Sequence, residues 1–276
     1  MATAQPARTA ITREVSAALA NCEPSFVSRA PIDLGLAIAQ HHAYLRALES
    51  LGCAMISLPA QDDLADSVFV EDVAVVLDEV AIMTRPGAAS RRAEVSSVAR
   101  VLARYRTVLE IIAPGTLDGG DVLRLGRDIY VCESARSNAS GIDQLRDLCT
   151  PLGYRVHSVV TQNCLHLKSA VTQVGAETLL INRAWLNQTF GDISLFAGWK
   201  MIDVDPAEEH AANALLVGDG LIHPACFPRT RRRLEDAGIA VIGVDVSELQ
   251  KAEGAVTCCS IVFVAATPSL DTNNHR

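Results

Sequence analysis

Pairs of short apolar segments, each joined by a brief polar turn, recur along the chain. The segments alternate or run continuously in Val, Ile and Leu, which is typical of half-buried and fully buried strands. Strand pairs are expected at Val68–Val76 with Val80–Thr84, Asp121–Leu125 with Asp128–Cys132, Ser169–Val174 with Thr178–Asn182, and Asn213–Val217 with Gly220–His223. A fifth segment, Cys258–Ala266, begins in the same way and lacks its second strand at the C-terminus.

Segments with helical spacing lie between the strand pairs. Apolar residues from Val95 to Leu102 follow an i, i+3, i+4 pattern, which predicts a helix over Ser90–Tyr105. Further helices are expected at Leu36–Leu51, Ser137–Leu152 and Pro228–Ala237. Another strand follows each helix, as at Ala54–Leu58, Tyr154–Val160 and Ala240–Val244.

The units repeat with a spacing of about 45–50 residues, a period typical of propellers and arrays. A unit that mixes strands with one helix does not bury its own apolar face, whereas five units packed in a ring would. The alternative is an ordinary α/β or α+β sheet whose strands only look periodic, and the pattern alone leaves both open. No Gly/Ser-rich or Pro-rich linker interrupts the series. One domain over residues 1–276 is therefore expected, with flexible tails at about 1–12 and 267–276.

Composition narrows the classes of partner. The chain of 276 residues is 49% hydrophobic and only 4% aromatic, which indicates a large aliphatic core. Its net charge of −8 argues against nucleic acid as a partner, because phosphate binding depends on cationic side chains. One basic cluster, Arg229 with Arg231–Arg233, is followed by Glu235 and Asp236 and is interpreted as a solvated helix face.

Two further patterns bear on the cellular compartment. No apolar run reaches the roughly 18–20 residues that span a bilayer, and residues 1–13 lack the apolar stretch of a signal peptide. No membrane association is expected. The eight cysteines are scattered without a CxxC pair, which indicates neither a disulfide framework nor a structural zinc site. A reducing cytoplasm is the expected location.

Polar residues stand at matching places in four units, next to the start of each strand pair. The first unit carries Glu71 and Asp72, and the second carries Asp118. The third carries His166, and the fifth carries Cys258. Each has a plainer explanation alone: a turn for the DGGD segment, a hydrogen-bonded core histidine, a buried thiol. Two carboxylates in an apolar strand are costly unless they are paired or meet a cation. If the units surround an axis, all these side chains converge on one central site.

Seven short motifs occur in an order that resembles a known family. They are Gln40–His42, Asp66–Asp72, Thr84–Arg92, Gly115–Asp121, Ser134–Asn138, Leu165–Lys168 and Thr257–Ser260. From about Asp33 to Val264 the chain resembles the dimethylarginine dimethylaminohydrolases, within the guanidino-group-modifying superfamily that includes arginine deiminases. The resemblance implies an α/β fold of five ββαβ units, a pentein-type propeller with a central active site, and so favours the ring.

The resemblance also implies roles in catalysis. Cys258 matches the nucleophile, and His166 matches the general acid and base. Asp118 and Asp72 match the carboxylates that hold the guanidinium, with Glu71 beside them. Cys259 occupies a position where other members carry various residues, so it is read as a neighbour.

Substrate contacts follow from the same comparison of motifs. Arg91 and Arg136 match the arginines that bind the α-carboxylate of the substrate, and Asp66 lies where its α-amino group is contacted. In related enzymes a leucine in a lid often covers the substrate. The corresponding stretch here, residues 22–31, contains no leucine, and its candidates are Phe26 and Val27. The preferred substituent on the guanidine is therefore left open.

The implied reaction is hydrolysis of asymmetric dimethylarginine or monomethylarginine to citrulline and the methylamine. A guanidinium carbon is a poor electrophile because its charge is delocalised, so a thiolate is a suitable nucleophile. Attack by Cys258 would form a thiouronium intermediate, and His166 would protonate the departing amine and then activate water. No cofactor is expected, and zinc captured adventitiously by this thiolate and imidazole would inhibit the enzyme.

Three alternatives stay open. The chain could act on another guanidine, as an arginine deiminase-like enzyme or an amidinotransferase, although arginine deiminases usually carry Glu where Asp118 stands. It could be a non-catalytic propeller that binds a partner, like the ribosome-binding initiation factor with the same five-fold ring. That reading predicts no assembled cysteine, histidine and carboxylate site. The resemblance is compatible with a homodimer.

Overall fold

The computed structural model describes residues 8–22, 27–161, 163–186 and 195–265. Its strands are β1 (Arg8–Arg13), β2 (Cys53–Leu58), β3 (Ala74–Val76), β4 (Val80–Met83), β5 (Thr107–Glu110), β6 (Val122–Leu125), β7 (Asp128–Cys132), β8 (Arg155–Val159), β9 (Val171–Gly175), β10 (Thr178–Ile181), β11 (Lys200–Asp203), β12 (Leu215–Val217), β13 (Gly220–Pro224), β14 (Val241–Val244) and β15 (Ile261–Val264). The α-helices are α1 (Leu34–Ser50), α2 (Val95–Leu102), α3 (Ala139–Cys149), α4 (Leu167–Ala170), α5 (Pro228–Asp236) and α6 (Ser247–Gln250).

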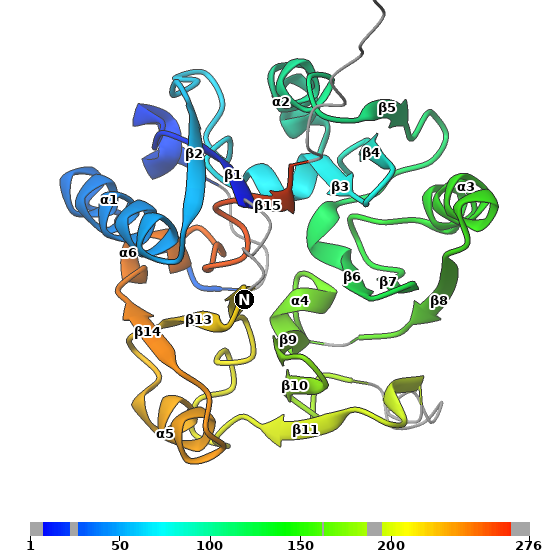
Figure 1. Cartoon of the computed structure of the whole chain (residues 1–276). Helices are drawn as coiled ribbons and strands as arrows, with labels where there is room; N and C mark the ends of the chain where they lie inside the picture. Colours follow the sequence, from blue (N-terminus) through cyan, green and yellow to red (C-terminus); the bar gives the residue numbers. More distant parts are fainter. Residues whose placement is uncertain (1–7, 23–26, 162, 187–194, 266–276) are drawn as a thin grey trace, which may run out of the picture.

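Five three-stranded sheets surround a common centre (Figure 1). In every sheet the middle strand pairs antiparallel with one neighbour and parallel with the other, as β4 does with β3 and β5. Strands β5, β8, β11 and β14 lie toward the rim, and helices α1, α2, α3 and α5 lie outside the sheets. The predicted ring of five units is confirmed.

The ring is closed by the N-terminal strand. Strand β1 lies between β15 and β2, with Ile11 opposite Ile261 and Ile56. It supplies the second strand that the fifth unit lacks at the C-terminus. The prediction of a flexible tail over residues 1–12 is therefore wrong for residues 8–12, whose apolar side chains Ala10 and Ile11 are fully buried. Residues 1–7 and 267–276 lie outside the described residues.

Neighbouring units share their cores. The described residues form five apolar clusters, and each combines side chains from two adjacent units. One cluster joins Ile11 and Phe263 of the fifth unit to Met83 and Leu102 of the first. The expectation that no unit buries its own apolar face is confirmed, and the ring depends on every contact between units.

The predicted helices are confirmed with shifted bounds. Helix α1 begins at Leu34, because the side chain of Asp33 accepts a hydrogen bond from the Leu36 amide and caps the helix. The segment expected to be helical from Ser90 begins as the 3₁₀ turn η3 (Ala89–Glu94) and becomes α2 only at Val95. Among the described residues no helix has the length and apolar character needed to cross a bilayer.

The innermost strands are shorter than the apolar pattern predicts. Strands β3, β9, β12 and β15 start later than expected, because tight turns precede three of them: η2 (Val70–Val73), α4, and the turn at 257–260. In a strand, successive side chains point to opposite faces. A helical turn instead buries both Glu71 and Asp72 near the centre of the ring. These turns carry the polar residues that the sequence singled out.

Candidate active site

Residues from four units converge on one small cavity at the centre of the ring. Seven of the eight predicted site residues line it, namely Asp66, Asp72, Arg91, Asp118, Arg136, His166 and Cys258. The eighth, Glu71, does not. The remaining lining residues are Cys22, Phe69, Leu165, Ala252, Glu253 and Gly254. The convergence inferred from the repeat is therefore observed for all but one of the predicted residues.

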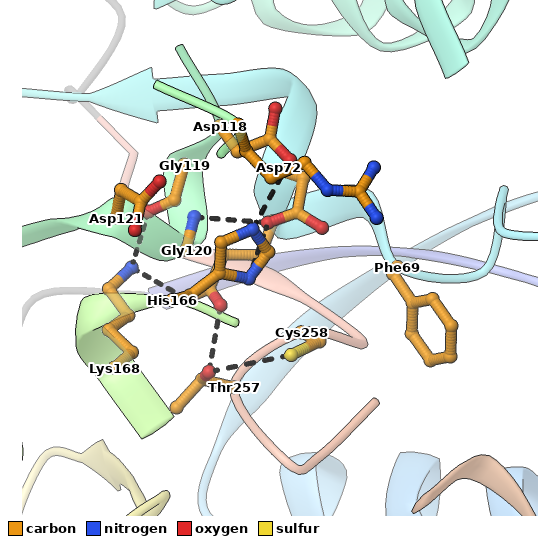
Figure 2. Close-up of polar contacts among 12 residues, drawn as sticks. Phe69, Asp72, Asp118, Gly119, Gly120, Asp121, His166, Lys168, Thr257 and Cys258 are labelled. Atoms are coloured by element: carbon orange, nitrogen blue, oxygen red, sulfur yellow. Dashed lines mark hydrogen bonds and ion pairs between the residues drawn. The ribbon is translucent and has the colours of Figure 1, made fainter. Parts of the chain in front are cut away.

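His166 lies between two buried carboxylates (Figure 2). Its Nε2 is 3.2 Å from Oδ2 of Asp118, and its Nδ1 is 3.8 Å from Oδ1 of Asp72. Burial alone would lower the pKa of His166, but the charges of Asp72 and Asp121 and the hydrogen bond to Asp118 outweigh it and raise the pKa to about 9. At neutral pH the imidazole is therefore a cation that can give up a proton.

This histidine makes stability depend on pH. Its pKa is about 9 in the folded chain against an ordinary 6.5. The protonated form of His166 therefore stabilises the fold fully below pH 6.5, and this stabilisation is lost as the pH rises through about 9. The loss lowers the free energy of unfolding by on the order of 3 kcal/mol. We expect the unfolding free energy from urea titrations to fall over this range. The fall should be absent in His166→Gln, and an equal fall in that variant would assign it to other groups.

Asp72 is held by two contacts besides His166. Its Oδ2 accepts from Nη1 of Arg91 at 2.5 Å, and its Oδ1 accepts from the amide of Gly120 at 3.0 Å. Burial opposes ionisation, yet the charges of His166 and Arg91 with these hydrogen bonds lower the pKa of Asp72 to about 2. The carboxylate is thus ionised and fixed in place before any ligand binds.

The guanidinium of Arg91 is hydrogen-bonded to four residues of the protein. Besides Asp72, its guanidinium pairs with Glu94 at 2.8 Å and donates to the carbonyl oxygens of Phe69 and Asp66. The family resemblance implied that Arg91 binds the α-carboxylate of the substrate. In this structure its donors hold Asp72 and the segment before η2 instead, so a positioning role is the one its contacts support.

Two glycines allow the close approach of the motifs. The amide of Gly87 donates to Oδ1 of Asp118 at 2.9 Å, and a Cβ at this position would lie 2.3 Å from the carbonyl oxygen of Arg136. A Cβ on Gly120 would lie 2.5 Å from Nδ1 of His166 and 2.8 Å from Oδ1 of Asp72. Any side chain at either position would displace the groups that form the site.

Gly120→Ala should damage activity far more than stability. The added methyl would push His166 away from Asp72, and small displacements of reacting groups cost about 10²-fold in rate. We expect kcat/KM to fall by roughly that factor in steady-state assays. Gly175→Ala on β9 is the matched control, because its Cβ would meet Thr178 only at an ordinary 3.4 Å. An equal loss in both variants would contradict the prediction.

Cys258 lies in the turn before β15 and is 8% exposed. Its carbonyl oxygen accepts from the amide of Glu71 at 3.1 Å, which ties the turn to η2. Burial, together with the charges of Glu71 and Asp72, raises the pKa of Cys258 to about 12. The thiol is therefore neutral in the empty site, and a cation bound beside it would favour the thiolate.

Glu71 faces away from the cavity that contains its neighbour Asp72. Its Oε1 accepts from Nζ of Lys168 at 2.6 Å, and its Oε2 accepts from the hydroxyl of Thr257 at 2.7 Å. It lines a second, larger cavity of about 390 Å³. The prediction that Glu71 binds substrate is not supported by this position.

Asp66, Arg136 and Glu253 all line the cavity. Burial raises the pKa of Asp66, while the charges of Arg91 and Arg136 oppose the shift. Of the two lid candidates, Phe26 lies outside the described residues. Val27 is described, and its amide donates to Oε1 of Glu253 at 2.9 Å. Its side chain contributes to a neighbouring pocket and not to the cavity that contains Cys258.

The carboxylates and His166 are close enough to resemble a cation site. Atoms of Asp72, Asp118 and His166 lie within 4.8 Å of one another. A protonated imidazole has no lone pair to offer a metal, and its pKa of about 9 makes this the prevailing form at neutral pH. The trio is thus better suited to an organic cation, and we assign no metal to it.

Sequence reasoning missed several groups. Glu94 is the buried partner of Arg91, Thr257 links Cys258 to Glu71, and Glu253 and Gly254 complete the wall of the cavity. Thr257 belongs to the quoted Thr257–Ser260 motif, so its proximity to the nucleophile was visible. Ala252–Gly254 had no such signal besides lying a few residues before Cys258.

The sequence matches a model of one family over residues 25–264, described as "N,N dimethylarginine dimethylhydrolase, eukaryotic". A protein of Streptomyces coelicolor called N(G),N(G)-dimethylarginine dimethylaminohydrolase is 42% identical over 257 residues, which cover 93% of this chain and 97% of the relative.

Solved structures agree with the sequence match. DDAH from Pseudomonas aeruginosa, in a Cys-to-Ser mutant complexed with citrulline, superimposes with a TM-score of 0.87 at 34% identity, covering 92% of this chain and 98% of that one. The N-terminal domain of a cyanobacterial arginine dihydrolase gives a TM-score of 0.81 at 17% identity, over 92% and 97% of the two chains. At that identity the second match bears on the fold alone.

Proposed function

The chain belongs to the dimethylarginine dimethylaminohydrolase family, and we propose on that premise that it hydrolyses asymmetric dimethylarginine and monomethylarginine to citrulline and the methylamine. It is proposed to act as a single catalytic domain. The observation that carries the proposal is the position of His166 between the ionised Asp72 and the buried Asp118, in the same cavity as Cys258.

The two carboxylates account for binding of a guanidinium. Asp72 and Asp118 are buried carboxyl groups that line the cavity, where charge-assisted hydrogen bonds to a planar cation are strong. A cation there also lowers the cost of ionising Cys258. Binding would thus place the guanidinium carbon beside the sulfur and convert the thiol into a nucleophile in one event.

The reaction would form a covalent thiouronium intermediate and then hydrolyse it. The thiolate of Cys258 bonds to the guanidinium carbon, and the bond from that carbon to the methylated nitrogen breaks as His166 donates its proton to the leaving amine. His166, now neutral, accepts a proton from water, whose oxygen bonds to the carbon of the thiouronium. The carbon–sulfur bond then breaks as the remaining hydroxyl proton passes to the sulfur, which releases citrulline and regenerates the thiol of Cys258.

We propose that the amino-acid end of the substrate lies toward Asp66 and Arg136. Asp66 would accept from the α-amino group, and Arg136 would bind the α-carboxylate, with Arg91 acting mainly through Asp72. The chemistry needs no cofactor. A methylated arginine is the proposed partner. Assembly as a homodimer and a reducing cytoplasm are further proposals, the latter supported by eight free cysteines.

The assignment is tested by supplying asymmetric dimethylarginine, monomethylarginine and arginine separately and measuring citrulline. We expect release from both methylated substrates and much less from arginine. Citrulline mainly from arginine would favour a deiminase-like activity at the same site. No citrulline from any of them, with folded and metal-free protein, would overturn the proposed function.

A further inference from the structure

Three polar residues behind Cys258 have no part in the mechanism above. Glu71, Lys168 and Thr257 are at least partly buried and contact one another. Nζ of Lys168 also donates to the carbonyl oxygen of Gly119 at 3.2 Å. A charged pair at the centre of a ring is costly to bury unless each member is hydrogen-bonded. All of these contacts are present, so the pair is held firmly in place.

A continuous set of contacts runs from the nucleophile to this pair, and Figure 2 shows the first of them, between Cys258 and Thr257. Sγ of Cys258 is 3.9 Å from Oγ1 of Thr257, and that hydroxyl donates to Oε2 of Glu71 at 2.7 Å. The side-chain amide of Asn213 donates to the same hydroxyl at 2.9 Å and accepts from the Thr257 amide at 3.0 Å. The orientation of Thr257 is thereby fixed.

The thiol needs a proton acceptor that His166 does not provide. With a pKa of about 9 the imidazole is already protonated at neutral pH, and its two nitrogens face Asp118 and Asp72. It must also keep that proton for the leaving amine. The thiol proton therefore has to leave by another route.

The far end of the contacts reaches a different cavity. Thr257, Glu71 and Lys168 line the larger cavity of about 390 Å³, which His166 and Cys258 do not line. This cavity lies among inner strands of the ring and includes Val75, Leu123 and Phe263 in its wall. A proton that arrives at Glu71 can exchange there with water, apart from the substrate.

We propose that Thr257 and Glu71 form a relay that removes the proton of Cys258 when substrate binds. The S–H bond of Cys258 breaks as its proton passes to Oγ1 of Thr257, and the hydroxyl proton of Thr257 passes to Oε2 of Glu71. The electron pair stays on sulfur and attacks the guanidinium carbon. Glu71 then returns its proton to water in the larger cavity. The inference rests on the proposed function, to which it adds Glu71 as a proton acceptor that acts through Thr257.

Glu71→Gln separates the relay from a purely electrostatic role. The negative charge of Glu71 helps to keep the thiol protonated, so its removal should lower the pKa of Cys258. If charge were all that mattered, more thiolate would form and kcat would be unchanged or higher. The relay predicts a fall in kcat of about 10²-fold, with KM changed less than about threefold. The thiol pKa is read from the pH dependence of iodoacetamide alkylation.

Thr257 provides an isosteric pair of variants. Thr257→Val removes the hydroxyl and keeps the shape, whereas Thr257→Ser keeps the hydroxyl. We expect kcat to fall by about 10²-fold in the valine variant and by less than about threefold in the serine variant. Asn213→Ala tests the structural explanation, since it removes the tether of Thr257 and leaves the relay atoms. If it matches Thr257→Val in kcat and in the pH profile of kcat, the loss is structural and the relay is wrong.

The outcomes distinguish this inference from the proposed function. Wild-type protein that releases citrulline, together with Glu71→Gln that keeps its kcat, would overturn the relay alone. Wild-type protein that releases no citrulline would overturn the proposed function. The pH dependence of alkylation would then still show whether Glu71 changes the pKa of Cys258. A thiol pKa that is the same in wild type and Glu71→Gln would show that Glu71 does not sense Cys258, which is incompatible with the relay.

Discussion

Replacing Cys258 by serine is expected to abolish citrulline release from asymmetric dimethylarginine, with kcat lower by about 10⁴-fold or more. Serine is nearly isosteric, so the turn before β15 and its hydrogen bond from Glu71 should persist. A hydroxyl, however, is far less acidic and less nucleophilic than a thiol. The variant should still bind substrate, which isothermal titration calorimetry can measure while citrulline is followed separately.

Cys259→Ser is the matched control for this variant. Cys259 is fully buried beside the nucleophile, and its thiol donates to the carbonyl oxygen of Ala255 at 3.4 Å. Serine can make the same hydrogen bond, so kcat should change by less than about threefold. Loss of activity in Cys259→Ser with retention in Cys258→Ser would transfer the nucleophilic role to the neighbour.

His166→Asn should lower kcat by about 10³-fold, because one side chain protonates the leaving amine and later activates water. Asparagine retains hydrogen-bonding capacity between Asp72 and Asp118 but transfers no proton. A substrate analogue whose leaving group departs unprotonated, such as an S-alkylthiocitrulline, should still react with Cys258. The thiouronium would then accumulate, because water is not activated, and mass spectrometry would detect it on the intact chain.

The control for this experiment is His210→Asn. His210 is more than half exposed and lies near Glu209, at 3.8 Å, outside the cavity of Cys258. Its replacement should leave kcat within about twofold of wild type. Rapid turnover of the thiol analogue by His166→Asn, with no accumulated adduct, would show that another group activates the water.

The sequence predicted the ring because its signal is spread over many residues. Each unit repeats an apolar strand pair, and several helices begin within a few residues of their predicted starts, as α3 and α5 do. The predicted strand bounds were wrong where the local apolar pattern and the tertiary contacts favour different structures. Val68–Val73 is apolar enough for a strand, yet the need to bury Glu71 and Asp72 near the centre makes part of it a helical turn.

Residue types in the site were predictable, but their partners were not. Cys258, His166 and Asp118 were identified from motifs, and the structure brings them to one cavity. Neighbours on the chain can nevertheless face different cavities, as Glu71 and Asp72 do. Arg91 was expected to face the ligand, whereas the structure pairs it with Asp72 and Glu94. Which side chains pair in the site depends on the distances between separate turns, and the sequence of one segment does not determine these distances.

The closure of the ring by β1 has a consequence for how the enzyme is made. During synthesis on a ribosome, β1 is among the first strands to emerge, yet one of its partners, β15, is among the last. Loop-closure entropy makes such a contact slow to form, and it is unavailable until β15 itself has been translated. Cys258 lies in the turn that leads into β15, so its position in the cavity depends on that pairing. The strand pairing that closes the ring thus also brings Cys258 into the buried surroundings that raise its pKa.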